Sequence, residues 1–175
     1  YKIAREFERN NSNVFVYKHD ELPADDIGKF EVYSQFAEKA KGEYLIFTQA
    51  DTVFSPEAVS STISAMAKNN SDVLTAFPSQ RAITFSEKAV LPGLDMIAYS
   101  GIVLRLKNHF KSPVFISLGK AWTAFRRNAY FEAVKYSGSV KSIDDGAGLR
   151  SYLKQKGFRI FNCSGKNMIF DFNYL

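Results

Sequence analysis

Apolar and polar positions along the chain repeat with two different spacings, one typical of strands and the other of helices. Residues 44–48, with the sequence YLIFT, form an unbroken apolar run of strand length. Such runs are typical of strands covered on both faces, so we predict a central strand there. Further strands are predicted over residues 14–18, 72–77, 114–118, 121–126 and 158–161.

Helical spacing and helix-end signals lie between these strands. Helices are predicted over residues 28–41, 55–69, 128–136 and 146–156, and residues 1–5 resemble the middle of another helix. Gly42 is expected to end its helix in the left-handed conformation, and Gly157 closes the last helix. Ser55, Pro56 and Glu57 provide an N-cap, a proline at the first helical position and an acid in the first turn. The alternation predicts an α/β fold, a sheet with helices packed against it, as a single domain over all 175 residues.

Residues 94–106 are apolar except for Asp95 and Arg105. Two interpretations are open for this stretch, a buried helix or a helix that lies on a membrane or a partner. No run of about 18 uncharged apolar residues is present, so the sequence does not predict a membrane-spanning segment.

Composition, net charge and cysteine count limit the class of protein and the kinds of partner that the chain can have. Hydrophobic residues make up 46% of the chain and charged residues 23%, which excludes bulk disorder. The net charge of +5 favours anionic partners such as acidic lipid headgroups and phosphorylated small molecules. Nucleic acid is not predicted as a partner, because no recognition helix or RNA-binding signature accompanies the basic residues. Cys163 is the only cysteine, so no intrachain disulfide can form, and a reducing compartment fits.

The sequence starts at Tyr1, with neither an initiator Met nor the apolar core of a signal peptide. We therefore expect the chain to be a segment of a longer protein.

One candidate site follows the apolar strand directly. Gln49, Ala50 and Asp51 come after the carboxyl end of residues 44–48. Ligands of open α/β sheets bind outside the carboxyl ends of strands, where an acid can reach a metal ion or a phosphate. The alternative is that Asp51 caps a turn before the next helix.

The second candidate is the acidic doublet Asp144 and Asp145, just before the last predicted helix. Acids at a helix N-terminus are stabilised by free backbone N–H groups and the helix dipole, and that structural role accounts for one of them. The alternative is that one carboxylate faces a cleft and accepts a proton from a hydroxyl nucleophile.

Two single side chains complete the candidates. Lys29, at the start of a predicted helix, can face a phosphate together with the helix N-terminus, or can be an ordinary exposed lysine. Trp122, the only tryptophan, can stack on a sugar ring or pack in the core.

The order and the local context of the motifs carry more information than any single motif. They are Gly28-Lys29, GEYLIFTQADT at 42–52, SPE at 55–57, FRRNAYF at 125–131, and Asp144-Asp145 followed by GFRI at 157–160. In this order they resemble the inverting glycosyltransferases of family 2, above all the ceramide glucosyltransferase and hopanoid-associated branch. The matching features there are a Gly-Lys, Gly-Glu-Tyr-Leu-Leu before an Asp-x-Asp motif, Arg-Arg-x-Ala-Leu, and an acidic doublet before Gly-Tyr/Phe-Arg-Ile. The resemblance covers nearly the whole chain and implies a GT-A fold, a Rossmann-like mixed sheet flanked by helices.

The resemblance also implies an activity, the transfer of a sugar from a nucleoside diphosphate sugar to a hydroxyl acceptor with inversion. Asp51 would bind the Mg²⁺ or Mn²⁺ that holds the diphosphate. Asp145, or as second choice Asp144, would deprotonate the acceptor hydroxyl. Lys29, Gln49 and Trp122 would contact the substrates. A lipid acceptor and a place at the cytoplasmic face of a membrane are expected from the same branch.

The sequence departs from the family pattern in three ways. Gln49 replaces the first acid of Asp-x-Asp, which lowers the expected metal affinity. The distance from Asp145 to Gly157 is about one residue longer than usual, so the choice of base stays open. The family's opening strand would lie before Tyr1 and its Gln-x-x-Arg-Trp motif beyond Leu175, so the isolated segment is expected to be inactive.

Two other functions are therefore kept open. One is a degenerate GT-A domain that binds a nucleotide or a partner without turnover, which the neutral Gln49 favours. The other is an anion- or nucleic-acid-binding α/β domain.

Overall fold

The computed structural model of the chain describes residues 2–17, 26–80, 93, 122–139, 146–165 and 167–171. Its central element is a four-stranded sheet with the strand order β1-β5-β3-β6. The strands are β1 (Tyr44–Thr48), β5 (Trp122–Arg126), β3 (Val73–Phe77) and β6 (Ile160–Ser164). β5 is antiparallel to both of its neighbours, whereas β3 and β6 are parallel.

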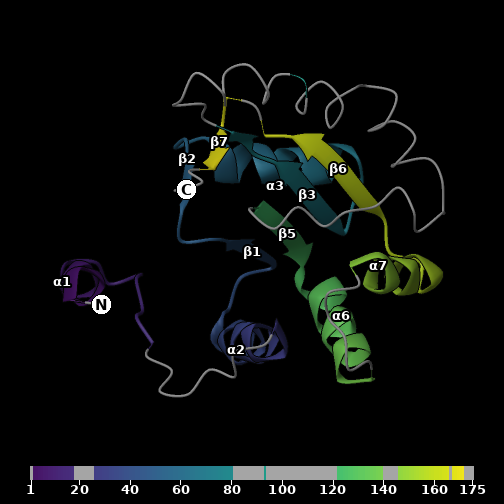
Figure 1. The fold of residues 1–175 in the computed structure, drawn as a ribbon, viewed down its shortest axis with the longest axis horizontal. Coiled ribbons are helices and arrows are strands. Elements are labelled where there is room, and N and C mark those ends of the chain that lie inside the picture. Colours follow the sequence, from purple (N-terminus) through teal and green to yellow (C-terminus); the bar gives the residue numbers. More distant parts are fainter. Residues whose placement is uncertain are drawn as a thin grey trace.

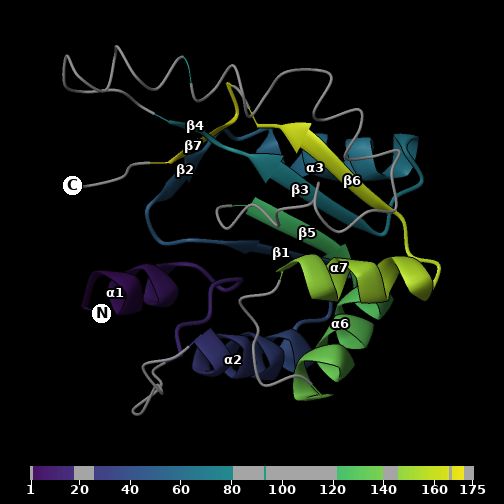
Figure 2. The ribbon, with the colours of Figure 1, turned by 45° about the vertical axis from the view of Figure 1, so that its right-hand side comes forward.

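Because only β5 is reversed, β1, β3 and β6 all run in one direction (Figure 2). Their last residues, Thr48, Phe77 and Ser164, therefore lie at one edge of the sheet, which we call the carboxyl edge. The opposite edge, where these strands begin and β5 ends, is the amino edge.

Side chains alternate between two apolar clusters, one on each face of the sheet, as the pleat of a strand requires. On one face the sheet packs against α3 (Ala58–Lys68), and on the other against α2 (Asp26–Lys39), α6 (Arg127–Ser139) and α7 (Gly146–Gln155) (Figure 1). The cluster under α3 includes Met66, Leu74, Trp122 and Ala124. The cluster on the other face includes Val73, Phe125 and Leu153. The described domain thus has three layers, helix, sheet and helices.

A second, smaller sheet extends the carboxyl edge. Its strands are β2 (Thr52–Phe54), β7 (Ile169–Asp171) and β4 (Ser79–Gln80), in the order β2-β7-β4. β2 follows β1 after a short turn, so the two sheets are joined there.

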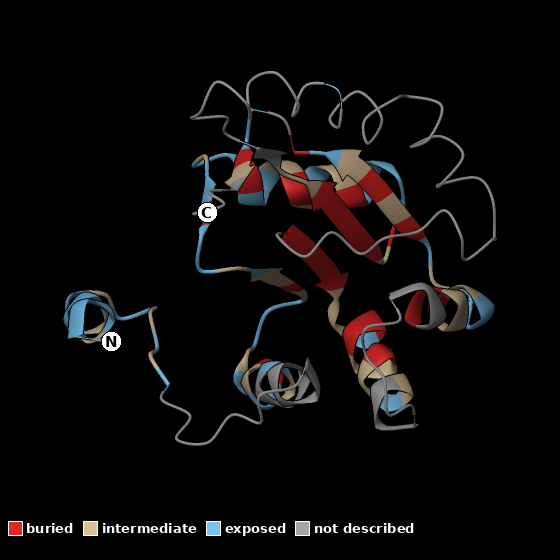
Figure 3. Cartoon of the chain, viewed as in Figure 1, coloured by how far each residue is buried: buried red, intermediate tan, exposed pale blue. Residues whose placement is uncertain are grey.

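The remaining helix, α1 (Lys2–Asn10), buries none of its residues and lies apart from the sheet (Figure 3). It confirms the helix expected at the start of the sequence. None of the helices in the described ranges has both the length and the apolar character needed to cross a bilayer.

The predicted strands at 72–77, 121–126 and 158–161 are confirmed with small shifts, and so are the four predicted helices. Residues 14–17 form no ladder among the described residues. The predictions for residues 94–106 and 114–118 lie outside the described residues.

Three details of the prediction are wrong. β1 pairs only with β5 among the described strands, so it is an edge strand there and not a central one. The left-handed glycine is Gly157, with φ of +88°, and not Gly42, because α2 already ends at Lys39. Ser55 is not the N-cap of α3. Its N–H donates to the carbonyl oxygen of Met168, its own carbonyl accepts from the N–H of Ala58 in a turn, and the helix starts after this turn with Glu57 as N-cap.

Candidate active site at the carboxyl edge

The polar turn after β1 lies at the carboxyl edge and joins the two sheets. The turn is closed by the N–H of Thr52, which donates to the carbonyl oxygen of Gln49 over 3.3 Å. Gln49 is half-buried, whereas Asp51 is exposed and makes no ion pair with any described residue. The side chain of Asp51 is therefore exposed at the carboxyl edge, and its role as a ligand stays a prediction.

Close packing holds the neighbouring strand ends together. The N–H of Gly165, just after β6, donates to the carbonyl oxygen of Phe77 at the end of β3 over 2.8 Å. A Cβ atom on residue 165 would come within 2.9 Å of that same oxygen, so only glycine fits there. The hydrogen bond and the close packing therefore fix the ends of β3 and β6 relative to each other at this edge.

Helix α7 runs antiparallel to β6, which directs its amino end toward the carboxyl edge. Its last residues connect through a short turn to the start of β6, and Arg150, one turn after the helix begins, bonds to Asn162 in the middle of β6. The first turn of α7 therefore lies on the side of the carboxyl end of β6 (Figure 2). Asp144 and Asp145 directly precede Gly146 in sequence but lie outside the described residues.

Arg150 anchors this helix through a buried guanidinium group. The side chain is fully buried, and its Nη2 donates to Thr75 Oγ1 at 3.3 Å and to Asn162 Oδ1 at 3.1 Å. Thr75 and Asn162 are partners in the register of β3 and β6, so one side chain ties α7 to both strands. Burial lowers the pKa of Arg150 to about 9.

Sequence reasoning missed Arg150 because arginine is usually exposed. The available signal was its position, since Arg150 lies beside Leu149 and three residues before Leu153, both of which are in the core.

Trp122 packs in the core, which decides between its two interpretations. Its side chain is 1% exposed, and its Nε1 donates to Thr62 Oγ1 on α3 at 3.1 Å. The ring of Phe54 meets it edge-on, with centroids 5.0 Å apart. Stacking of Trp122 on a sugar ring does not fit this geometry, because no face of the indole is open. Lys29 lies in α2, and its side chain is outside the described residues.

In the turn after β1, a divalent ion would find one carboxylate, that of Asp51. No group of three or more Asp, Glu, His or Cys side chains comes together in the described part of the chain. Asp51 supplies a carboxylate, and the amide oxygen of Gln49 is a neutral donor. Mg²⁺ is commonly held by one or two carboxylates together with water and substrate phosphates, so this donor set fits an ion that arrives with a diphosphate.

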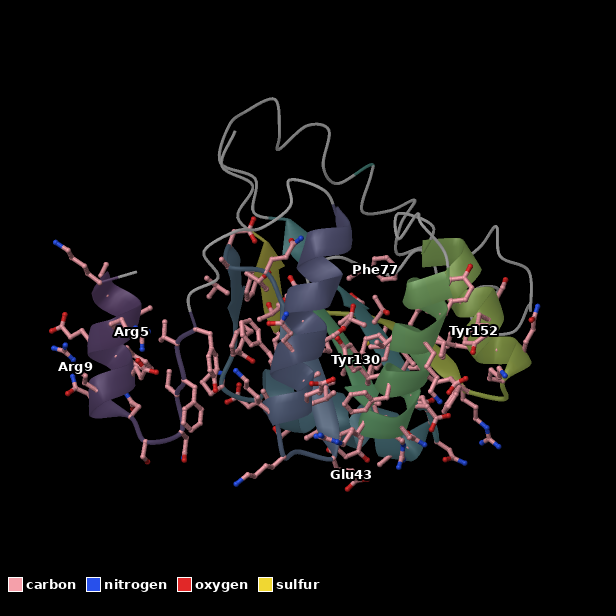
Figure 4. All side chains as sticks on the ribbon, turned by 90° about the horizontal axis from the view of Figure 1, so that it is seen from below. Arg5, Arg9, Glu43, Phe77, Tyr130 and Tyr152 are labelled. Carbon is pink, nitrogen blue, oxygen red and sulfur yellow. The ribbon has the colours of Figure 1, made fainter. Side chains whose placement is uncertain are left out.

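A hollow of about 470 Å³ lies at the opposite, amino edge, lined by Glu43, Arg126, Arg127, Asn128 and Phe131. Figure 4 shows Glu43 at one end of the domain and Phe77, at the carboxyl edge, toward the other. This hollow is therefore separate from the turn that carries Asp51.

Both arginines of that hollow are bound to the protein itself. Arg127 Nη1 donates to the carbonyl oxygens of Ala40 and Gly42, just after α2. Arg126 lies 3.5 Å from Asp72 and 3.6 Å from Glu43. The two arginines of the Arg-Arg motif therefore connect the ends of α2, β1, β3 and β5 at the amino edge through contacts within the chain.

The mixed sheet, its helices on both faces and the polar turn after β1 together have the arrangement of a GT-A domain, the class of the nucleotide-sugar transferases. The family model described as "Glycosyl transferase family 2" matches residues 1–130. The chain belongs to glycosyl transferase family 2. No curated protein matches the sequence.

The family match confirms a glycosyltransferase domain, whose substrates are a nucleotide-sugar donor and an acceptor. It includes Gln49, Asp51 and Trp122 but ends before the acidic doublet. The branch within the family and the roles of individual residues therefore stay predictions.

Proposed function

We propose that the protein transfers a sugar from a nucleoside diphosphate sugar to a hydroxyl acceptor, with inversion at the anomeric carbon. The observation that carries this proposal is the geometry of the carboxyl edge. Asp51 is exposed there, and α7, directly preceded in sequence by Asp144 and Asp145, has its amino end toward the same edge. Membership of family 2 supplies the donor class.

Asp51 and Gln49 hold the diphosphate end of the donor in this proposal. Asp51 binds Mg²⁺ or Mn²⁺, and the amide of Gln49 adds a neutral contact to the ribose or to water. When bound, the ion neutralises charge on the diphosphate leaving group. Lys29, near the start of α2, contributes a positive charge to the phosphates.

The acidic doublet provides the general base. Asp145, with Asp144 as second choice, accepts the proton of the acceptor hydroxyl. The hydroxyl oxygen then bonds to the anomeric carbon from the face opposite the nucleotide. The bond from that carbon to the diphosphate oxygen breaks, and the nucleoside diphosphate leaves with the electron pair. One displacement from the opposite face inverts the configuration.

The test is sugar transfer by the natural full-length chain, with a panel of nucleotide sugars and with Mn²⁺ or Mg²⁺. Asp145→Asn, or failing that Asp144→Asn, is expected to abolish transfer while thermal unfolding stays unchanged, and proton NMR of the product should show the inverted anomer. Glu43→Gln, an exposed acid at the amino edge, is the matched control and should stay active. Full activity in both doublet variants would overturn the assignment of the base.

A lipid acceptor and a location at the cytoplasmic face of a membrane are the finer part of the proposal. The net charge of +5 and the resemblance to lipid-modifying transferases support them. Cosedimentation should be stronger with vesicles that contain acidic phospholipid than with neutral vesicles. Equal binding to both, together with transfer to a soluble acceptor only, would contradict this part.

Gln49 favours a second candidate function, a domain that binds nucleotide or a partner without turnover. The neutral amide at this position leaves Asp51 as the carboxylate of the turn. Calorimetric titration with several nucleoside diphosphates, with and without Mn²⁺, separates the two. Metal-dependent binding followed by transfer supports the enzyme, and binding without transfer in any donor and acceptor pair supports the binding domain.

A further inference from the structure

Trp122 contacts the protein on both sides of the turn that carries Asp51. In the register of β1 and β5, Trp122 is the partner of Thr48, the residue just before Gln49. Its ring also meets the ring of Phe54, three residues after Asp51, at 5.0 Å and an interplanar angle of 62°. Trp122 therefore contacts the chain on both sides of the turn, at Thr48 before it and at Phe54 after it.

The position of Trp122 is itself fixed by α3. Trp122 Nε1 donates to Thr62 Oγ1 at 3.1 Å, and that hydroxyl donates in turn to the carbonyl oxygen of Ala58 at 2.7 Å. Thr62 and Ala58 are buried, and the indole is 1% exposed. An indole with a bonded N–H in a close-packed core has little freedom to shift.

Backbone hydrogen bonds also hold the turn that carries Asp51. The Asp51 side chain is exposed, and the N–H of Thr52 closes the turn by donating to the carbonyl oxygen of Gln49. Among the described strands, β2 pairs with β7, a three-residue strand of the small sheet, and not with a strand of the main sheet. The contact between Phe54 and Trp122 is therefore a direct packing link from β2 to the main sheet.

We propose that Trp122 is a positioning residue for the Asp51 turn, so that metal-dependent binding of the donor depends on a side chain that does not touch the donor. This inference rests on the proposed function, because it assumes that Asp51 holds the diphosphate through an ion. A displacement of about 1 Å in a positioned group can lower a reaction rate by about 100-fold, and we expect the metal-dependent affinity for the donor to fall in the same direction.

The experiment measures the affinity of the full-length chain for nucleoside diphosphates by calorimetry, with Mn²⁺ and with EDTA. Trp122→Leu removes the ring, and Phe54→Leu removes the other half of the contact from a side chain that is 44% exposed. Trp122→Phe keeps an aromatic ring that can still meet Phe54, while it loses the N–H that donates to Thr62 and one ring of the buried indole. Val53→Ala, the neighbouring position on β2 and 54% exposed, is the matched control.

Both leucine variants are expected to bind about 10- to 100-fold more weakly with Mn²⁺, as Asp51→Asn does, and to equal the wild type in EDTA. Trp122→Phe and Val53→Ala should stay within about threefold of the wild type with Mn²⁺, which a general loss of stability would not produce. Affinities are normalised to the folded fraction, and Phe54→Leu keeps the test valid if Trp122→Leu does not fold.

Wild-type affinity in folded Phe54→Leu would overturn the positioning role while leaving the proposed function intact. Absence of metal-dependent binding in the wild type itself would instead overturn the proposed function. The two failures are thus distinguishable.

Discussion

The two edges of the main sheet use charged side chains in opposite ways. At the amino edge, Arg126 and Arg127 bind carboxylates and backbone carbonyls of the scaffold. At the carboxyl edge, the exposed carboxylate of Asp51 makes no ion pair with any described residue, although the backbone around it is well bonded.

The difference suggests two uses of charge within one domain, a structural use at the amino edge and, in the proposed function, ligand binding at the carboxyl edge. A charge that is already paired stabilises the fold and has little left to offer a ligand. A charge held in place by its backbone and by apolar neighbours keeps its full attraction for a ligand, since preorganised groups need no rearrangement on binding. The amino edge is therefore expected to affect stability, and the carboxyl edge activity.

The largest expected effect is on activity, from Asp51→Asn. The amide keeps the size of the side chain but removes the charge that would bind the ion, so transfer should fall by about 100-fold or more. The melting temperature should stay within about 1 °C of the wild type, because Asp51 is exposed and surface substitutions of this kind are nearly neutral. Steady-state transfer rates over a range of Mn²⁺ concentrations provide the measurement.

The matched control at the other edge is Glu43→Gln, which also exchanges an exposed acid for its amide. The Glu43 side chain is 72% exposed and 3.6 Å from Arg126. Transfer by this variant should equal that of the wild type. Similar losses in both variants would mean that the two edges do not differ in the way described.

The next effect is on stability, from Arg127→Met at the amino edge. Methionine keeps the apolar part of the side chain but cannot bond to the carbonyl oxygens of Ala40 and Gly42. Hydrogen bonds from charged groups contribute about 1.5–3 kcal/mol, so a loss of about 1–3 kcal/mol in unfolding free energy is expected. Urea denaturation measures it.

The same variant should bind donor with unchanged affinity once binding is referred to the folded fraction. A large loss of affinity in folded Arg127→Met would place a ligand contact at the amino edge and would remove the contrast between the two edges.

Much of the main sheet could be predicted, because each of its strands carries a signal in its own sequence. The runs at 44–48, 72–77 and 121–126 are of strand length and consist of apolar or β-branched residues apart from Asp72 and Arg126, and each contains a strand of the sheet. The small sheet had no such signal. β2, β4 and β7 have two or three residues each, too few for a period to be visible, and they exist because the ends of longer elements bring them together.

The position of the candidate site in the fold could be predicted from the sequence, but the buried contacts that hold its neighbouring elements in place could not. That Asp51 follows a strand is visible in the sequence, and the structure confirms its place at the carboxyl edge. The partners that hold Trp122 and Arg150 could not be predicted from the sequence, because they lie on α3 and on the paired strands β3 and β6. These contacts join residues far apart in sequence, and no local pattern records them.

The smallest expected effect tests the scaffold through pH. Glu132 on α6 accepts hydrogen bonds from Lys135 Nζ at 2.9 Å and from Tyr152 Oη on α7 at 2.8 Å. These bonds, that from Lys135 first, lower the pKa of Glu132. A carboxyl group with a lowered pKa in the folded protein contributes stability above its ordinary pKa of about 4, and this contribution is lost as the pH falls through the lowered value.

Glu132→Gln should therefore lower the melting temperature at pH 7 by roughly 2 °C or less, and the difference from the wild type should shrink as the pH falls toward about 3. Differential scanning calorimetry of the two proteins over this range checks both statements. A difference that grows on acidification would show that the charged carboxylate of Glu132 does not stabilise the contact between α6 and α7. Donor binding at pH 7 should be the same in both proteins, because Glu132 serves the scaffold and not the carboxyl edge.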